Sequence, residues 1–201
     1  MGGVTSFSLF SDMKKLILLV LLVLLLLSAC SRQTADDEQD FNTSPPLVTA
    51  AENGDLPTIR KLLDGDTQVD VKDACLWTPL MKAALNGHLE AAIRLIEAGA
   101  DVNQVDKGGY SALMLAVSNN HAEIADLLLQ KGAKVNQMEV TGGWTALIWA
   151  TKLGHTESVR TLLAHQADAE LKDYDGKSAL DWAETNQHGE IARLLETLQS
   201  E

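Results

Sequence analysis

A short phrase recurs four times in this chain at a nearly constant spacing, and that spacing limits the folds it can adopt. Each copy has Thr or Ser, then Pro or Ala, then Leu. The copies begin at Thr78, Ser111, Thr145 and Ser178, in steps of 33, 34 and 33 residues. Histidines follow the same period, at His88, His121, His155 and His188. Two markers with one period of this length predict a row of stacked supersecondary units.

The residues of one unit predict a helix, a tight turn and a second helix. The hydroxyl that opens each phrase can accept a hydrogen bond from an unpaired amide in the first helical turn, and Pro79 is tolerated at the first helical position. A short apolar helix over residues 80–85 ends at Gly87, which allows the positive φ of a tight turn. Apolar side chains at helical spacing then predict a second helix over residues 88–98, which Gly99 ends.

The period and the phrase Thr78-Pro79-Leu80 resemble the ankyrin repeat, a turn followed by two antiparallel helices. The resemblance covers Leu47 to about Leu198 and implies an all-α solenoid of stacked helix-turn-helix units with short turn fingers. One unit cannot bury its apolar faces alone, so neighbours must stack. Within the domain 47–201 we expect a starting cap at 47–72, full repeats at 73–105, 106–138 and 139–172, and a closing repeat at 173–201.

The repeats depart from the family pattern at three places. The family's histidine in the opening phrase is replaced in every copy, by Met81, Met114, Ile148 and Asp181, so we expect the hydrogen bonds credited to it to be absent. Gln166 stands where the earlier repeats have Gly99 and Gly132, and one extra residue lies within 139–143. We expect the repeat that carries Gln166 to be the least stable.

The first thirty residues carry the pattern of a secretory signal. Two lysines after Met13 precede twelve unbroken apolar residues, 16–27, and small residues follow. A helix that spans a bilayer needs ~20 apolar residues, so this run is too short to be one. Residues 1–29 are therefore predicted to be a signal peptide, with translation starting at Met13. An ordinary apolar helix or a membrane anchor is the alternative.

The ending Leu27-Ser28-Ala29-Cys30 is similar to a bacterial lipobox. The resemblance implies that Cys30 is lipidated, becomes the new N-terminus and anchors the protein through several acyl chains, which hold a membrane more stably than one. Ser31 after the cysteine implies an outer-membrane location facing the periplasm of the bacterial cell envelope. Residues 30–46 are polar, acidic and without periodicity, so they are predicted to be a flexible tether.

The charge of the chain limits its partners. Removal of residues 1–29 takes away two lysines and one aspartate, which leaves 14 basic and 27 acidic residues and a formal charge of −13. This balance disfavours nucleic acid, whose phosphates need a basic surface, and also disfavours flat contact with anionic lipid. It is consistent with steering of a basic partner, or simply with a soluble surface that repels itself.

The sequence predicts no catalytic site, no metal and no cofactor. Four of the five histidines follow the repeat period, and stacked helices lie about 8–10 Å apart, whereas zinc ligands each lie ~2 Å from one shared ion. The histidines are therefore interpreted as structural. No H-E-x-x-H, no G-x-S-x-G and no glycine-rich phosphate loop is present. The chain is predicted not to be an enzyme.

The remaining candidate site is a protein-binding surface. The resemblance implies that partners bind along the concave face made by the finger tips and inner helices. Four residues occupy the same finger position, just before the capping hydroxyl: Trp77, Tyr110, Trp144 and Lys177. Stacking would align them as a stripe, and Tyr and Trp are common in interface hot spots. Packing between neighbouring fingers is the alternative for this stripe, and it is the preferred interpretation for Trp149 and Trp182 inside the inner helices.

We therefore expect a monomeric, lipid-anchored periplasmic adaptor or scaffold that binds a protein partner without catalysis. An immunity or inhibitor protein, which neutralises a toxin or hydrolase in the periplasm, is the alternative. An enzyme with a metal or cysteine site is a third class. The fold alone does not identify the partner.

Overall fold

Residues 44–198 are described by the computed structural model, and they form ten helices, α2 to α11. Within these residues the extended structure is limited to two isolated bridges at the bases of two fingers. The predicted all-α class is therefore confirmed. The predictions for residues 1–43, which include the signal peptide, Cys30 and most of the tether, lie outside the described residues.

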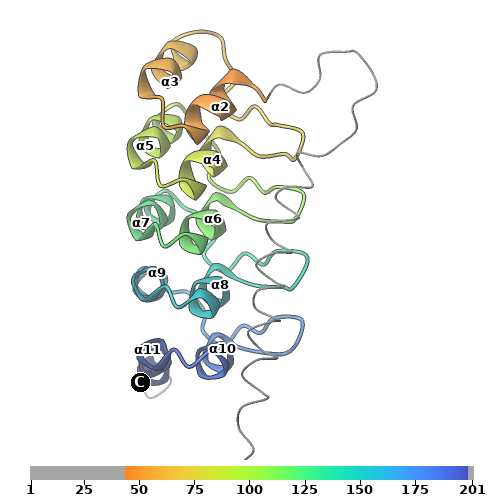
Figure 1. Ribbon diagram of the computed structural model, residues 1–201, viewed down its shortest axis with the longest axis vertical. Helices are drawn as coiled ribbons and strands as arrows, with labels where there is room; N and C mark the ends of the chain where they lie inside the picture. The colour runs from red at the N-terminus through yellow and green to blue at the C-terminus, as the bar shows by residue number, and fades with distance from the viewer. Residues whose placement is uncertain (1–43, 199–201) are drawn as a thin grey trace, which may run out of the picture. The chain divides into compact units, whose positions relative to one another are not determined.

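The helices form two layers, each of which receives one helix from every pair (Figure 1). The inner layer contains α2 (Pro46–Glu52), α4 (Pro79–Leu85), α6 (Ala112–Ser118), α8 (Ala146–Leu153) and α10 (Ala179–Thr185). The outer layer contains α3 (Leu56–Leu63), α5 (Leu89–Glu97), α7 (Ala122–Gln130), α9 (Thr156–Ala164) and α11 (Gly189–Leu198). Each helix contacts its partner and the neighbouring helices of its own layer. The fingers project from the inner layer, away from the outer helices (Figure 1).

The apolar core runs through all the helix pairs. Leu80, Leu113 and Leu147 of the first three phrases are each 1% exposed, whereas Leu180 of the last phrase is partly exposed. This difference follows from position, because the last repeat has a stacking neighbour on one side only within the described residues. Burial of each leucine therefore depends on the adjacent repeat, as expected for a solenoid.

The hydroxyl residues of the repeated phrase cap the inner helices, as predicted. Each side-chain oxygen accepts a hydrogen bond from the backbone N–H three residues later, at 3.2 Å for Thr78, 3.3 Å for Ser111, 3.2 Å for Thr145 and 3.3 Å for Ser178. In the last repeat Asp181 accepts a reciprocal bond at 2.7 Å from the N–H of Ser178. In the first repeat the Sδ atom of Met81 accepts a similar bond at 3.5 Å from the N–H of Thr78. The expectation of a missing bond therefore does not hold in these two repeats, because aspartate and methionine supply an acceptor.

The periodic histidines join each repeat to the one before it. A ring nitrogen lies within hydrogen-bond distance of a carbonyl near the end of the preceding inner helix: His88 at 3.0 Å from Glu52, His121 at 3.2 Å from Leu85 and His188 at 3.3 Å from Lys152. The glycine of the preceding helical turn leaves room for each ring, since a Cβ on Gly87 would lie 2.6 Å from the His121 ring. These contacts support the structural interpretation of the histidines.

The fourth histidine contact is built differently because a glycine is missing. Asn120, at φ 58°, stands where the turns that receive the other three rings have Gly54, Gly87 and Gly154, so its Cβ occupies the space that a ring would otherwise use. His155 accordingly uses Nδ1 and contacts the Val117 carbonyl at 2.8 Å. Asn120 in turn accepts a hydrogen bond from the buried Ser158 hydroxyl at 3.0 Å. The larger residue is thus accommodated by a second polar contact.

One boundary differs slightly from the sequence expectation. The first inner helix begins at Pro46, the last residue of the predicted tether, and no side-chain cap opens it.

Gln166 adopts the backbone conformation of the glycines that it replaces. Its φ is 61° after α9, close to the left-handed region of Gly99 at 93° and Gly132 at 87°. A residue with a Cβ is therefore held where the earlier repeats use glycine, which costs roughly 1–2 kcal/mol.

Gln166→Gly is expected to raise the free energy of unfolding by roughly 0.5–1 kcal/mol. Relief of the left-handed strain exceeds the entropy that glycine adds to the unfolded chain. Urea unfolding followed by circular dichroism would measure the change. The matched control is Ala164→Gly in the last turn of α9. Glycine is a poorer helix former than alanine, so this substitution should instead lower the free energy of unfolding by up to about 1 kcal/mol. An unfolding midpoint that falls for Gln166→Gly would contradict the strain argument.

Candidate protein-binding surface

Each of the four fingers has a carboxylate at its base that accepts backbone hydrogen bonds and holds the turn. In three fingers the Oδ1 atom of an aspartate accepts hydrogen bonds from the backbone N–H groups two and four residues later. These aspartates are Asp73, Asp106 and Asp173, with N···O distances of 2.8 to 3.0 Å. The later donor is in each case the residue just before the capping hydroxyl. The carboxylates therefore hold three of the predicted contact residues in place, namely Trp77, Tyr110 and Lys177.

The third finger is one residue longer, and its carboxylate is longer by one methylene. Glu139 Oε1 accepts from the N–H groups of Gly142 at 2.6 Å and Trp144 at 3.1 Å, and Oε2 accepts from the N–H of Thr141 at 2.6 Å and from its hydroxyl. Burial acts to raise the pKa of Glu139, but these hydrogen bonds together leave the pKa below its usual value. The glutamate thus holds Trp144 in the same way as the aspartates hold their residues.

Neighbouring fingers are also joined to one another. The N–H of Val140 donates to the carbonyl of Gly108 at 3.0 Å, and the N–H of Tyr174 donates to the carbonyl of Gly142 at 2.9 Å. Val140 and Tyr174 expose 63% and 66% of their surface at the tips. The second, third and fourth fingers therefore form a connected row with two exposed large side chains, Val140 and Tyr174.

The four predicted contact residues differ in accessibility. Tyr110, Trp144 and Lys177 are partly exposed, whereas Trp77 is 8% exposed and belongs to the core. The Lys82 ammonium lies 4.7 Å from the centroid of the Trp77 ring and covers it further. Trp77 is therefore a packing residue, which was the alternative interpretation of this stripe. The other three side chains remain accessible.

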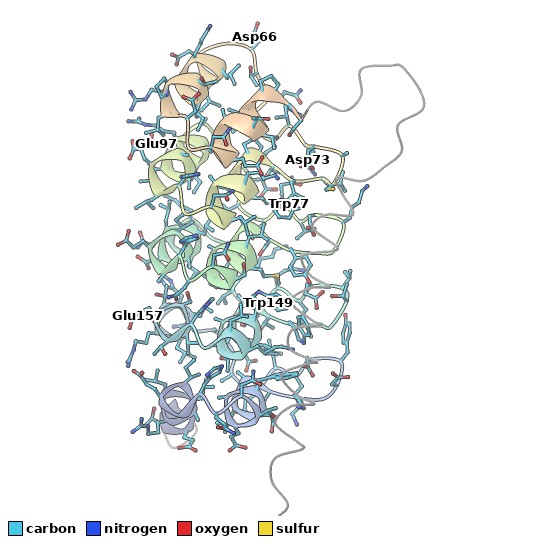
Figure 2. The ribbon with its side chains drawn as sticks, viewed as in Figure 1. Asp66, Asp73, Trp77, Glu97, Trp149 and Glu157 are labelled. Atoms are coloured by element: carbon cyan, nitrogen blue, oxygen red, sulfur yellow. The ribbon has the colours of Figure 1, made fainter. Side chains whose placement is uncertain are left out.

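Three of the predicted residues join a larger group on the inner helices. The Trp149 ring on α8 lies 4.6 Å from the Trp144 ring and 6.0 Å, edge to face, from the Tyr110 ring. Figure 2 shows Trp149 on the inner helix, and Glu157 on the opposite, outer side. We name the whole group the aromatic–lysine cluster; its members are Tyr110, Trp144, Trp149, Lys152, Lys177 and Trp182.

Lys152 is the member that the sequence interpretation missed. Its ammonium lies 3.6 Å from the centroid of the Trp144 ring and 3.5 Å from that of the Trp182 ring, so two indoles enclose it. Lys177 lies 4.3 Å from the Trp182 ring. Such distances allow cation–π attraction. The available signal was the spacing of Lys152 three residues after Trp149, which places both on one face of a helix.

Asp173 fixes the two indoles that enclose Lys152. Its Oδ2 accepts hydrogen bonds from Nε1 of Trp144 at 3.1 Å and from Nε1 of Trp182 at 2.7 Å, while its Oδ1 turns the last finger. The carboxylate is 5% exposed. Burial acts to raise the pKa of Asp173, but the four donors outweigh burial and leave the pKa below its usual value. One buried charge therefore orients both rings.

The environment of Lys152 disfavours its charge. Burial, together with the positive charge of Lys177, lowers the pKa of Lys152 to about 8. The carboxylates of Asp173, Asp175 and Glu139 act in the opposite direction without restoring the usual value. The ammonium is therefore held between the rings at a cost in hydration.

The described residues contain neither a grouped set of metal ligands nor a membrane-spanning helix. Between residues 44 and 198, no three His, Cys, Asp or Glu side chains are grouped so that they could hold a metal ion. In the same segment no helix has the length and apolar character needed to cross a membrane.

A comparison with protein families agrees with this geometry. The family model described as ankyrin repeats (three copies) matches residues 47–139 and 136–199. These two matches cover the cap, every repeat and the whole aromatic–lysine cluster. Proteins of this family typically bind other proteins through such repeats.

Asp173→Asn is expected to lower the free energy of unfolding by about 2–3 kcal/mol. The asparagine side chain has one oxygen that accepts and one NH₂ that donates. Its NH₂ must therefore face either the two indole N–H groups or the two backbone N–H groups, and that pair of buried donors loses its acceptor. Urea unfolding at pH 7 measures the loss. Asp175→Asn, in the exposed part of the same finger, is the control and should change stability by less than about 0.5 kcal/mol. Equal effects of the two substitutions would exclude the anchoring role of Asp173.

Proposed function

The chain belongs to the ankyrin-repeat family, and we propose that it is a lipid-anchored adaptor of the bacterial periplasm that binds a protein partner without catalysis. The observation that carries this proposal is the aromatic–lysine cluster. Its four aromatic rings are each partly exposed, and they come from the second and third fingers and from the inner helices α8 and α10. Clustered Tyr and Trp side chains supply much of the affinity of protein interfaces.

The positions of the polar side chains favour binding over catalysis. Four of the five histidines contact main-chain carbonyls of the preceding repeat, and the finger carboxylates accept main-chain hydrogen bonds. His165 contacts Asp126 at 2.7 Å and so joins the end of α9 to α7 in the outer layer. A general base needs a free position beside a substrate, and these groups serve the fold instead.

The membrane part of the proposal is supported by the sequence pattern around Cys30. A short apolar run, small residues and a cysteine fit a lipoprotein signal better than a spanning helix. Acylation of Cys30 would place the solenoid on the periplasmic side of the outer membrane. We further propose that the anchored protein is monomeric.

An immunity or inhibitor protein remains the second candidate function. Both candidates need the same kind of surface, so the cluster does not distinguish them. The neighbouring genes would: an adjacent gene for a secreted toxin favours immunity, and an adjacent gene for a periplasmic enzyme favours an adaptor.

Substitution of the predicted contact residues tests the binding surface. Tyr110→Ala and Trp144→Ala are expected to weaken partner binding, and at least one of them should cost ~2 kcal/mol or more. Trp77→Ala is the matched control, because this buried ring should lower unfolding stability and change affinity little. The partner is first captured from envelope extracts with the wild-type solenoid, and affinity and urea stability are then measured for each variant.

Two outcomes would contradict the surface assignment. Unchanged affinity for Tyr110→Ala and Trp144→Ala, with the true partner in hand, would move the interface elsewhere, for example to the acidic outer helices. A loss of affinity that only parallels the loss of stability in all three variants would identify the rings as packing residues.

Cys30→Ala tests the anchor. The variant should lose lipidation and either leave the membrane fraction or remain unprocessed, because no acyl chain can be attached to alanine. Fractionation of cells and metabolic labelling with a fatty acid would measure both effects. Cys75→Ala is the control and should keep the label. A processed Cys30→Ala protein that stays on the membrane would exclude the lipoprotein assignment.

A further inference from the structure

The indoles of Trp144 and Trp182 enclose a space that already accepts a cation. The Lys152 ammonium lies 3.6 Å and 3.5 Å from the two ring centroids, well inside the ~6 Å over which an aromatic face attracts a positive charge. Trp144 comes from the third finger and Trp182 from α10, so two successive repeats build the two walls. We name this space the indole slot.

The slot is held open by a buried anion. Asp173 accepts a hydrogen bond from each indole N–H, at 3.1 Å and 2.7 Å, and is 5% exposed. Its other oxygen is fixed by two main-chain amides of the finger, so its position does not depend on Lys152. The walls and the negative charge beside them therefore persist when the cation leaves.

The charges around the slot are mixed, with more negative than positive groups. The charged groups that act on Lys152 are Asp173 and Asp175 of the last finger, Glu139 of the third finger, and Lys177. The whole chain carries a net charge of −12. Such a field attracts basic rather than acidic ligands.

We propose that the indole slot is a cation-binding subsite for a basic protein partner, whose arginine or lysine side chain enters between Trp144 and Trp182 as Lys152 leaves. This inference rests on the proposed function, since it assumes that a partner binds this face. In the free protein Lys152 fills the slot and keeps the two rings in contact with a charge. In the complex the partner's side chain takes that place, and Lys152 gains full hydration outside the slot.

Arginine suits the exchange better than a second lysine. A guanidinium ion is planar and more weakly hydrated than an ammonium ion, so it stacks on indole faces at a smaller cost in hydration. Lys152 competes from within the same molecule, which gives it a high effective concentration. Partner binding is consequently expected to be weak at the slot alone and to depend on neighbouring contacts of the aromatic–lysine cluster.

A peptide titration tests the slot without any knowledge of the partner. The probe is an acetylated, amidated pentapeptide with one arginine between glycines, and the matched control peptide has neutral citrulline in its place. Binding is followed by the indole N–H signals of Trp144 and Trp182 in NMR spectra. Lys152→Ala is expected to bind the arginine peptide at least about tenfold more tightly than the wild type at pH 7, because the competing amine is removed. The citrulline peptide should not shift the indole signals of either protein.

The unaltered protein provides a second arm. Inside the slot Lys152 has a pKa of about 8, so its neutral fraction rises from about one tenth at pH 7 to about nine tenths at pH 9, whereas a hydrated lysine outside the slot, with a pKa of about 10.4, stays protonated. Displacement of Lys152 therefore takes up a proton, and the apparent affinity for the arginine peptide should fall roughly tenfold from pH 7 to pH 9. Lys152→Ala should lose this dependence on pH. Lys82→Ala, which removes the lysine over the buried Trp77, is the control and should behave like the wild type.

Several results would overturn the proposal. Equal responses to the arginine and citrulline peptides would show that charge is not recognised. An affinity that is unchanged in Lys152→Ala, and unchanged in the wild type from pH 7 to pH 9, would show that Lys152 does not occupy a ligand site. Because the titration uses no partner, its failure leaves the proposed partner binding intact, and a failed capture experiment leaves the slot chemistry standing.

Discussion

The hydrogen bonds accepted by the carboxylate at the base of each finger are the interaction on which the candidate surface depends. A finger is too short to have a core of its own, so a side-chain acceptor must take the place of a sheet or helix. Asp106 shows the result: it fixes the N–H of Tyr110, which directly precedes the cap of α6. The shape of the finger and the start of the helix are thereby set by nearby residues. The backbone at Tyr110, which lies between Asp106 and the cap, is held by both.

The same chemistry connects the fold to the candidate site in the last repeats. Asp173 turns its finger with one oxygen and orients two indoles with the other, so a single buried charge serves both purposes. Such a network is stable only when every polar member is satisfied, because an unpaired buried group is costly. The rings around Lys152 are consequently more rigid than exposed aromatic side chains, and a rigid site loses less conformational entropy on binding.

The repeat period predicts most of the fold, because each marker has a local physical role. Thr78 caps a helix and Gly99 reverses the chain, so both helices of a unit follow from nearby residues. The candidate site is only partly predictable, because it depends on contacts between repeats. The position just before the capping hydroxyl indicated the partly exposed Tyr110 and Trp144, but it also indicated Trp77, which is buried. Lys152 was missed because its two aromatic neighbours lie 8 and 30 positions away in the chain.

The repeat pattern is broken at two places, around Lys152 and at Gln166, and the two breaks have different consequences. Lys152 occupies the helix position at which the other repeats have Leu85, Ser118 and Thr185. Trp149 and Trp182 occupy the position at which the first two repeats have Lys82 and Leu115. Packing alone would favour the aliphatic residues, whose burial carries no cost in charge hydration. Gln166 departs too, but it lies after an outer helix, where it adds backbone strain. Local rules are broken at both places, yet only around Lys152 do the substitutions build a common structure. This convergence is what a functional surface predicts.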